Sequence, residues 1–444
     1  MNRQGATSKG LKKRIGDLGF DKVHDPRAAG QVIHPLVAVL TALVTAMVTC
    51  SRSLRQVEER TGQIAKKHGG WMGIVGRIAA NTLGRVLPRL RFVEMMSCLH
   101  RLIKREYRRG NLRPTFLPLG AVAIDGKNIA TLRWHDMCRV LELEESEAAP
   151  EQVKTLFAER FGDAQVCIPT SGRPYALVRV HTVTLISSGA SVCIHLRPTL
   201  GHTNEIGSMP ALLRELKAAY GRTRLFELVT TDAGNTSLAV ASLSVALGWH
   251  YFAQIKSVQG AIFEEAERAL GNRPDEDADA SYVDTQNGQI ISYHLWRCDL
   301  SDAGWLQWTH ARQLIRVRRT AEDPKTEVSS VGNRYYVTSK SPDALAARSA
   351  LKISRAHWRC ENCTHWTADA ELQEDRRRLA WSRHPIGVLI VSALRMMALA
   401  ILSVARLLTR LEYSLERPTW AQVSGHFLLE LCDSILDTEA FDNV

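Results

Sequence analysis

The stretch "PLGAVAIDGK", residues 118–127, decides how the rest of the chain can fold. Small and apolar residues alternate through it, and a carboxylate follows them, which is the pattern of a strand that stops at Asp125. Segments before this stretch have helical periodicity, whereas strands and helices alternate after it. We therefore expect a helical region first and then an α/β sheet, with its chemistry at the ends of the strands.

The next segments extend this sheet. "LVRVHTVTLISSGASVCIHLRPT" (177–199) predicts a hairpin that turns at residues 188–190. "GSMPALLRELKAAYG" (207–221) predicts a helix closed by its final glycine. "RLFELVTTDAG" (224–234) predicts a buried strand that ends in Asp232. The order is strand, hairpin, helix, strand, and we expect a carboxylate at the end of the first and last strands.

Changes in periodicity and composition divide the chain into four parts. Residues 1–115 are expected to form a helical, basic domain. Residues 116–249 are expected to form the first part of the α/β core, with a glutamate-rich insertion at 131–176. A strand-rich insertion is expected at 250–342, and a helical part of the core at 343–444.

The net charge of +11 is unevenly distributed. Residues 1–120 hold 22 Lys and Arg against 7 Asp and Glu, which favours a polyanionic partner such as double-stranded DNA. A solvated basic surface is the alternative. The basic residues expected to bind DNA lie in the last predicted helices of this region: Arg85, Arg89, Arg91, Lys104, Arg105, Arg108 and Arg109.

Cysteine usage argues against a disulfide-stabilised protein, and hydropathy argues against a membrane-spanning one. Nine cysteines at irregular spacing do not make a disulfide framework, which indicates a cytoplasmic protein. Two apolar segments, 32–50 and 386–408, are long enough to raise the question of a membrane span. Pro35 interrupts the first segment, and Arg395 and Arg406 interrupt the second. Both are therefore predicted to be interior helices, because an arginine inside a bilayer is costly.

Acidic residues stand where metal-dependent phosphodiester chemistry needs them. Asp125 and Asp232 follow predicted strands, and a third acid comes from a later group that comprises Glu361, Glu371, Glu374 and Asp375. Two-metal cleavage of a phosphodiester requires a few convergent carboxylates. Two strand ends and a following helix can supply them, although single aspartates at strand ends more often cap turns.

The stretch "RAHWRCENCTHW" (355–366) raises an alternative, a zinc site. A tetrahedral zinc site needs four converging ligands, and the chain has no second Cys-x-x-Cys. On a helix, His357 and Cys363 lie about 120° apart. His357, Glu361 and His365 instead follow i, i+4, i+8 spacing and share one face. The spacing favours a site built around Glu361.

Several motifs, in order along the chain, resemble those of DDE transposases of the ISAs-type, or H-repeat-associated, family. They are "DPR" (25–27), "NTLGRVL" (81–87), "IDGK" (124–127), "TNEIGSMPALL" (203–213), "LVTTDAG" (228–234), "HYFAQIKSVQ" (250–259), "RAHWRCENCTHW" (355–366) and "QED" (373–375). Their common order is more specific than any single match.

The resemblance implies that Asp125, Asp232 and Glu361 are the catalytic, metal-binding triad of an RNase H-like core. It implies Mg²⁺ or Mn²⁺ as cofactor, cleavage at insertion-sequence ends, strand transfer into target DNA, and a homo-oligomer acting on DNA in the bacterial cytoplasm, associated with the nucleoid. Accessory roles would fall on Lys127, Asn204, Lys256, Arg355 and His357, and for each of these a structural role is the alternative.

The chain also departs from the family pattern. "DAGNTS" (232–237) lacks the usual histidine and glutamine, and "KSVQ" (256–259) replaces Lys-Gly-Asn-Gln. These departures leave the triad intact but alter residues expected to position the substrate. A catalytically inactive or domesticated DNA-binding derivative of a transposase is therefore the alternative function.

Overall fold

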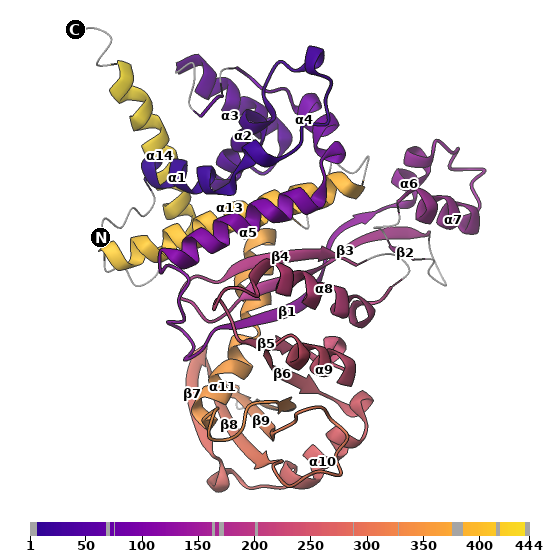
Figure 1. Ribbon diagram of the computed structural model, residues 1–444, viewed down its shortest axis with the longest axis vertical. Helices are drawn as coiled ribbons and strands as arrows, with labels where there is room; N and C mark the ends of the chain where they lie inside the picture. The colour runs from indigo at the N-terminus through magenta and orange to yellow at the C-terminus, as the bar shows by residue number, and fades with distance from the viewer. Residues whose placement is uncertain are drawn as a thin grey trace.

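The computed structural model describes residues 7–67, 72–74, 76–161, 165–167, 173–199, 203–286, 288–326, 328–374, 385–413 and 418–439. Its centre is one mixed sheet of ten strands with helices packed around it (Figure 1). The strand order is β2-β3-β1-β5-β6-β10-β9-β8-β7, and β4 pairs with β3. The expected mixed α/β class is therefore confirmed.

The strands are β1 (Ala121–Leu132), β2 (Gln165–Cys167), β3 (Tyr175–Leu185), β4 (Val192–Pro198), β5 (Leu228–Thr231), β6 (His250–Ile255), β7 (Ala280–Gln286), β8 (Gln289–Asp299), β9 (Gln313–Glu322) and β10 (Ser329–Thr338). The helices among and after them are α6 (Trp134–Leu141), α7 (Pro150–Arg160), α8 (Glu205–Tyr220), α9 (Leu238–Ala246), α10 (Ala261–Leu270), α11 (Ala347–Ala356), the π-helix η7 (Cys360–His365) and α12 (Trp366–Leu372).

Four strands of the sheet are those that the strand, hairpin, helix, strand pattern predicted, and β6 lies beside them as a fifth. β3 and β4 form the predicted hairpin, and β1 pairs antiparallel with β3. β1, β5 and β6 are parallel to one another, because α8 and α9 return the chain to the same end of the sheet before each new strand. Helix α8 ends before Gly221, as predicted.

The first strand corrects one expectation. β1 does not stop at Asp125 but runs on to Leu132. Its long antiparallel ladder with β3 holds it extended, from Val122 opposite Leu185 to Leu132 opposite Ala176. The parallel ladder with β5 is much shorter and ends at Ile124. Asp125 therefore lies inside a strand, directly after the point where the pairing of β1 with β5 ends.

The far end of the β1–β3 ladder carries the segment expected as an insertion. Helices α6 and α7 and the short strand β2 pack at this end, away from the rest of the sheet (Figure 1). At the opposite edge of the sheet, β7 to β10 form an antiparallel meander. Tyr335 of β10 pairs with Ile255 of β6, so the strand-rich segment continues the same sheet.

A helical layer covers the β4 side of the sheet. It contains α1 (Ser8–Leu18), α2 (Leu36–Val48), α3 (Leu54–Lys67), α4 (Ala80–Val86), α5 (Phe92–Arg108), α13 (Pro385–Tyr413) and α14 (Trp420–Glu439). Short 3-10 turns join the elements: η1 (Phe20–Lys22), η2 (Ala29–Gln31), η3 (Leu87–Arg89), η4 (Ala233–Asn235), η5 (Ser257–Gln259) and η6 (Asp275–Asp277). α13 lies alongside α5 and also packs on α2 and β4 (Figure 1).

The two apolar segments are interior helices, as the sequence predicted. Among the described residues, Ile386–Arg410 is the one helix long and apolar enough to cross a membrane, and its apolar window is entirely buried in the protein. Arg395 is 5% exposed and lies 3.8 Å from the carboxylate of Glu374. Arg406 donates to the carbonyl of Pro418. Each interrupting arginine thus has a polar partner within the fold.

Candidate active site

Two aspartates mark the point where the parallel strands β1 and β5 separate. Ile124 and Thr231 form the last pair of this ladder, and Asp125 and Asp232 follow them directly. β5 ends there because Asp232 caps the 3-10 turn η4. Its Oδ1 accepts hydrogen bonds from the backbone N–H (3.0 Å) and the side-chain amide (2.8 Å) of Asn235. The register of the sheet therefore brings these two predicted acids to neighbouring positions.

The third predicted acid, Glu361, lies in a π-helix. The N–H of Trp366 donates to the carbonyl of Glu361, which is the i+5 bond of a π-turn. The regular i, i+4, i+8 spacing assumed for this segment is therefore wrong, because α11 ends at Ala356 and the π-turn inserts an extra residue. π-turns inside helices frequently occur at functional sites.

The three carboxylates act on one another electrostatically. Burial is the main cause that raises the pKa of Asp125 to about 7, and the negative charges of Glu361 and Asp232 add to this shift. Burial also raises the pKa of Glu361, with the charge of Arg334 opposing and that of Asp232 adding to the shift. The sequence-predicted acids thus form one cluster whose members repel one another when all are ionised.

The donor chemistry of this cluster fits a divalent cation. Its ligands are carboxylate oxygens, which Mg²⁺ and Mn²⁺ prefer, and its mutual repulsion is of the kind that a bound cation relieves. In the described part of the chain, no three His, Cys, Asp or Glu side chains already stand in metal-holding geometry. The cluster is therefore suited to a cation in charge and ligand type, without being a closed coordination shell.

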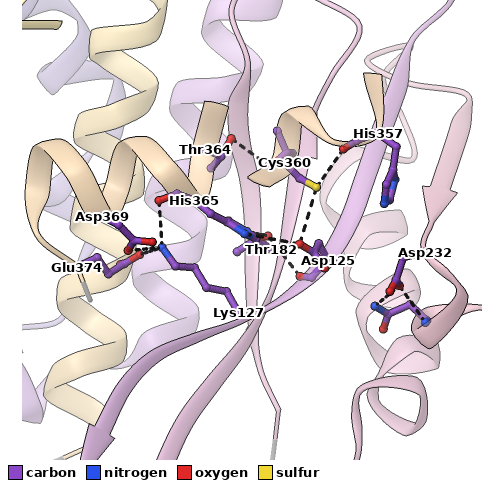
Figure 2. A network of polar contacts seen from close by, with 12 residues as sticks. Asp125, Lys127, Thr182, Asp232, His357, Cys360, Thr364, His365, Asp369 and Glu374 are labelled. Carbon is purple, nitrogen blue, oxygen red and sulfur yellow. Dashed lines mark hydrogen bonds and ion pairs between the residues drawn. The ribbon is translucent and has the colours of Figure 1, made fainter. Parts of the chain in front are cut away.

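Two histidines flank the cluster in neutral form (Figure 2). Burial lowers the pKa of His357 and of His365 to about 4. His357 Nδ1 lies 2.8 Å from the hydroxyl of Thr230, and His365 Nε2 lies 2.6 Å from that of Thr182. The other ring nitrogen of His365 lies 3.6 Å from Asp125 Oδ2. His365, not His357, is therefore the histidine in contact with a predicted catalytic acid.

Cys360 is packed as a buried thiol beside the acids. Its Sγ donates to the carbonyl of His357 at 3.0 Å and lies 3.9 Å from Asp125 Oδ2. Burial and the charges of Asp125 and Glu361 raise the pKa of this thiol. A zinc ligand has to be a thiolate, so these surroundings disfavour the zinc alternative.

Two of the predicted accessory residues have structural partners. Lys127 is 8% exposed and forms ion pairs with Asp369 and Glu374, each at 2.8 Å (Figure 2). Asn204 caps helix α8, its side-chain oxygen accepting the N–H of Gly207 at 2.8 Å.

The two remaining accessory candidates are Lys256 and Arg355. Lys256 is exposed directly after β6, at the start of the turn η5. Arg355 reaches across to the meander, 3.1 Å from Asp284 Oδ2, with its guanidinium 3.9 Å from the centre of the Tyr282 ring. Arg355 therefore links α11 to β7.

The basic residues predicted to bind DNA differ in availability. Arg85, Arg89, Arg91, Arg105 and Arg108 are exposed. Arg89 donates to the carbonyl of Pro26, Arg91 pairs with Glu94, and Lys104 is half-buried above the ring of Tyr220. Arg109 pairs with both Asp17 and Glu106. The exposed set is therefore better placed to meet a polyanion than Arg109, which is held by two carboxylates.

A second basic surface, which sequence reasoning missed, adjoins Glu361. A groove of about 1040 Å³ runs between the meander and α11, and Asn362 and Cys363 form part of its wall. Its basic lining residues are Arg319, Arg334, Arg348, Lys352, Arg355 and Arg359. Asp284 is the only acid among the described residues of the lining. We call this surface the basic groove.

Aromatic rings alternate with the cations of the basic groove. The guanidinium of Arg334 lies 4.2 Å from the centre of the Trp358 ring, and that of Arg359 lies 4.2 Å from the Phe116 ring. Cations stacked on aromatic faces are a common lining for nucleic-acid grooves. The residues come from positions 116 to 363, so only the assembled fold brings them together.

A polar network behind Asp232 also escaped prediction. Asn235, which holds Asp232, lies 3.0 Å from His181 Nε2 on β3. The other nitrogen of His181 lies 3.0 Å from Ser208 Oγ on α8. The Asp-x-x-Asn spacing at 232–235 is the one local signal for this cap, whereas His181 has no signal in its own segment.

The chain matches a known protein family. A family model described as a transposase DDE domain matches residues 119–384, a span that includes all three acids. No curated protein matches the sequence. Among solved structures, the chain is similar to a piggyBac transposase in a cryo-EM synaptic complex with hairpin DNA. The identity is 10%, the match covers 97% of this chain and 78% of that one, and the TM-score is 0.43. This likeness is too remote to assign a role to any residue.

Proposed function

Because the chain belongs to the transposase DDE domain family, we propose that it cleaves DNA at the ends of an insertion sequence and joins the freed ends to target DNA. The observation that carries the proposal is the electrostatic cluster of Asp125, Asp232 and Glu361 beside the basic groove. Acids alone suit many sites, and basic grooves alone suit many partners. Their adjacency suits the hydrolysis and transfer of DNA phosphodiesters.

Asp125, Asp232 and Glu361 would hold the divalent cations, Mg²⁺ or Mn²⁺. When bound, such ions activate the attacking oxygen and stabilise the leaving oxygen of a phosphodiester. The protein's own contribution is to fix the acids: Asn235 orients the carboxylate of Asp232, and the sheet register fixes Asp125 beside it. The neutral ring of His365 packs against Asp125 without adding a competing positive charge.

The five strands β4, β3, β1, β5 and β6 would constitute an RNase H-like core. Their order, with β3 antiparallel to β1 and with β1, β5 and β6 parallel, supports this assignment. In such a core the helical residues 1–115 would be the DNA-binding domain. The strand-rich insertion, predicted at 250–342, would begin after β6 and contain the meander β7 to β10. The described helices α1 to α5 and the meander support this division.

DNA would lie along the basic groove and approach the acids from the Glu361 side. Its exposed cations, Arg334, Arg348 and Lys352, offer phosphate contacts, and the aromatic rings offer apolar surface to bases. The exposed Arg85, Arg105 and Arg108 would add contacts from the helical layer. The ordered motifs further support membership of the ISAs-type branch, with a homo-oligomer acting on DNA in the bacterial cytoplasm.

The test is a cleavage assay on labelled element-end DNA with Mg²⁺. Wild type is compared with Asp125→Ala and Glu361→Ala, and DNA binding is measured in parallel. We expect nicking by wild type, and a loss of at least a hundredfold with binding retained in both variants. Binding without cleavage by wild type would instead support the inactive, domesticated alternative.

A further inference from the structure

Lys127 occupies a closed polar site between β1 and α12 (Figure 2). Its ammonium group donates to Asp369 Oδ1 at 2.8 Å, to Glu374 Oε2 at 2.8 Å and to the carbonyl of His365 at 3.3 Å. An ammonium group has three N–H donors, so this geometry uses all of them. Lys127 therefore has no donor left for a DNA phosphate, and at 8% exposure it has little access to one.

The partners of Lys127 connect it to the segment that carries Glu361. His365 is the last residue of the π-helix, and its ring contacts Asp125 and Thr182. Lys127 lies two residues after Asp125 on the same strand, so both side chains point to the same face. One lysine thus joins the strand of the first acid to the π-turn of the third.

Glu374 extends the connection to the interior of the protein. Its carboxylate is fully buried, and it accepts a hydrogen bond from Ser392 Oγ at 2.8 Å and lies 3.8 Å from Arg395. Both partners belong to α13, the helix at the centre of the helical layer. The group formed by Lys127, Asp369, Glu374, Ser392 and Arg395, which we call the Lys127 network, therefore ties β1, α12 and α13 together.

We propose that Lys127 is a positioning residue, which fixes the π-turn against β1 so that Glu361 stays in register with Asp125. The π-turn has an irregular backbone, and the bond from Lys127 to the His365 carbonyl holds its C-terminal end. This inference rests on the proposed function, because the relative position of Asp125 and Glu361 matters only if both acids hold the same cations. It also gives a specific form to the structural role that was the alternative for Lys127.

The variants have to separate positioning from folding. Lys127→Met leaves the carboxylate of Glu374 buried with one partner fewer, which destabilises the fold. Lys127→Met combined with Glu374→Gln removes both charges of this buried pair, and the glutamine keeps a side-chain oxygen for Ser392 and Arg395, so much of the melting temperature is expected to return. Lys154→Met removes an exposed lysine of α7, far from the network, and serves as the matched control.

Three quantities are measured for each full-length variant: DNA affinity against salt, cleavage rate at saturating DNA, and Mn²⁺ affinity by electron paramagnetic resonance. We expect the double variant to melt near wild type and to bind DNA with the same salt slope. Its cleavage rate should fall at least tenfold and its Mn²⁺ dissociation constant should rise at least threefold. Lys154→Met should match wild type in all three.

Two results would overturn the inference. A double variant with a native melting temperature and wild-type cleavage and Mn²⁺ affinity would show that the network only stabilises the fold. A salt slope smaller by about 0.9 in Lys127→Met would show that Lys127 neutralises a DNA phosphate. Wild type that binds Mn²⁺ but does not cleave would contradict the proposed function alone, and the Mn²⁺ comparison would still decide the role of Lys127. Wild type without Mn²⁺ binding would contradict both.

Discussion

Asp125 and Asp232 stand at the same level of the sheet, because each directly follows a member of the last parallel pair, Ile124 with Thr231. The two strands behave differently from that point. β5 ends in the turn that Asp232 caps, whereas β1 continues along β3. The divergence opens one edge of β1 beside Asp125, and the π-turn with Glu361 lies next to this position.

The raised pKa of Asp125 predicts how stability depends on pH when no cation is present. Its folded-state pKa of about 7 exceeds the ordinary value of 3.8, so the folded protein binds more protons than the unfolded chain between these values. The contribution of the Asp125 carboxyl group to the free energy of unfolding is fully present below pH 4 and is lost as the pH rises through 7. Asp125→Asn should therefore stabilise the protein at pH 8 in EDTA, by at most about 4 kcal/mol, and change little at pH 4.

Urea unfolding at the two pH values measures this difference. Mn²⁺ should narrow the gap at pH 8, because it stabilises wild type and not the variant. Equal stability of the two proteins at pH 8 in EDTA would mean that Asp125 is not in a repulsive acidic cluster.

The basic groove predicts a salt-dependent contribution to DNA binding. Arg348 and Lys352 are exposed residues of its α11 wall, and replacing both with Gln removes two cations that are candidates to neutralise phosphates. The slope of log affinity against log salt should decrease by about 0.9 for each phosphate that is no longer neutralised, whichever DNA sequence is used. Fluorescence anisotropy at several salt concentrations measures this slope, with Lys154→Gln as control. An unchanged slope would place the DNA elsewhere.

The surroundings of Cys360 predict that the Cys-x-x-Cys pair has no role in catalysis. Cys363→Ser should leave cleavage within about twofold of wild type, because the acids and not the thiols hold the cations. Metal analysis of the purified protein should find zinc at about a tenth of an equivalent per chain or less, far below a stoichiometric structural site. One zinc per chain that disappears in Cys363→Ser would revive the zinc alternative.

Helix α13 predicts a large loss of stability when one of its core side chains is shortened. Leu394 is fully buried, so Leu394→Ala should lower the free energy of unfolding by about 3 kcal/mol. Leu429 on α14 is 62% exposed, and Leu429→Ala is the matched control with an expected change below about 0.5 kcal/mol. Similar losses in both variants, measured by urea unfolding without detergent, would contradict the interior placement of α13.

Local patterns predicted the elements whose pairing is local. The hairpin of β3 and β4 and the helix ending before Gly221 depend on turn and cap residues within a few positions, and both were predicted. The length of β1 was not. Its continuation past Asp125 depends on pairing with residues 176–185, which the alternation inside residues 118–127 does not reveal.

The candidate site was likewise predicted only where its features depend on local sequence. Asp232 was predicted to follow a buried strand, and it does follow β5 directly. The π-turn at Glu361 was not predicted, because a single inserted residue does not alter helical composition. The partner of Lys127, Glu374, lies 247 residues away, so the sequence left both an accessory and a structural role open for Lys127. Four of the six cations of the basic groove come from one segment, residues 348–359, but the strands and rings that complete the groove come from distant segments.

Mn²⁺ binding, measured by electron paramagnetic resonance, tests most directly whether the three acids form one cation site. Asp125→Asn, Asp232→Asn and Glu361→Gln should each weaken Mn²⁺ binding at least tenfold. Glu371→Gln, a nearby half-buried acid of α12 outside the cluster, should bind Mn²⁺ as wild type does. Wild-type Mn²⁺ affinity in any of the three cluster variants would show that the replaced acid is not part of a shared cation site.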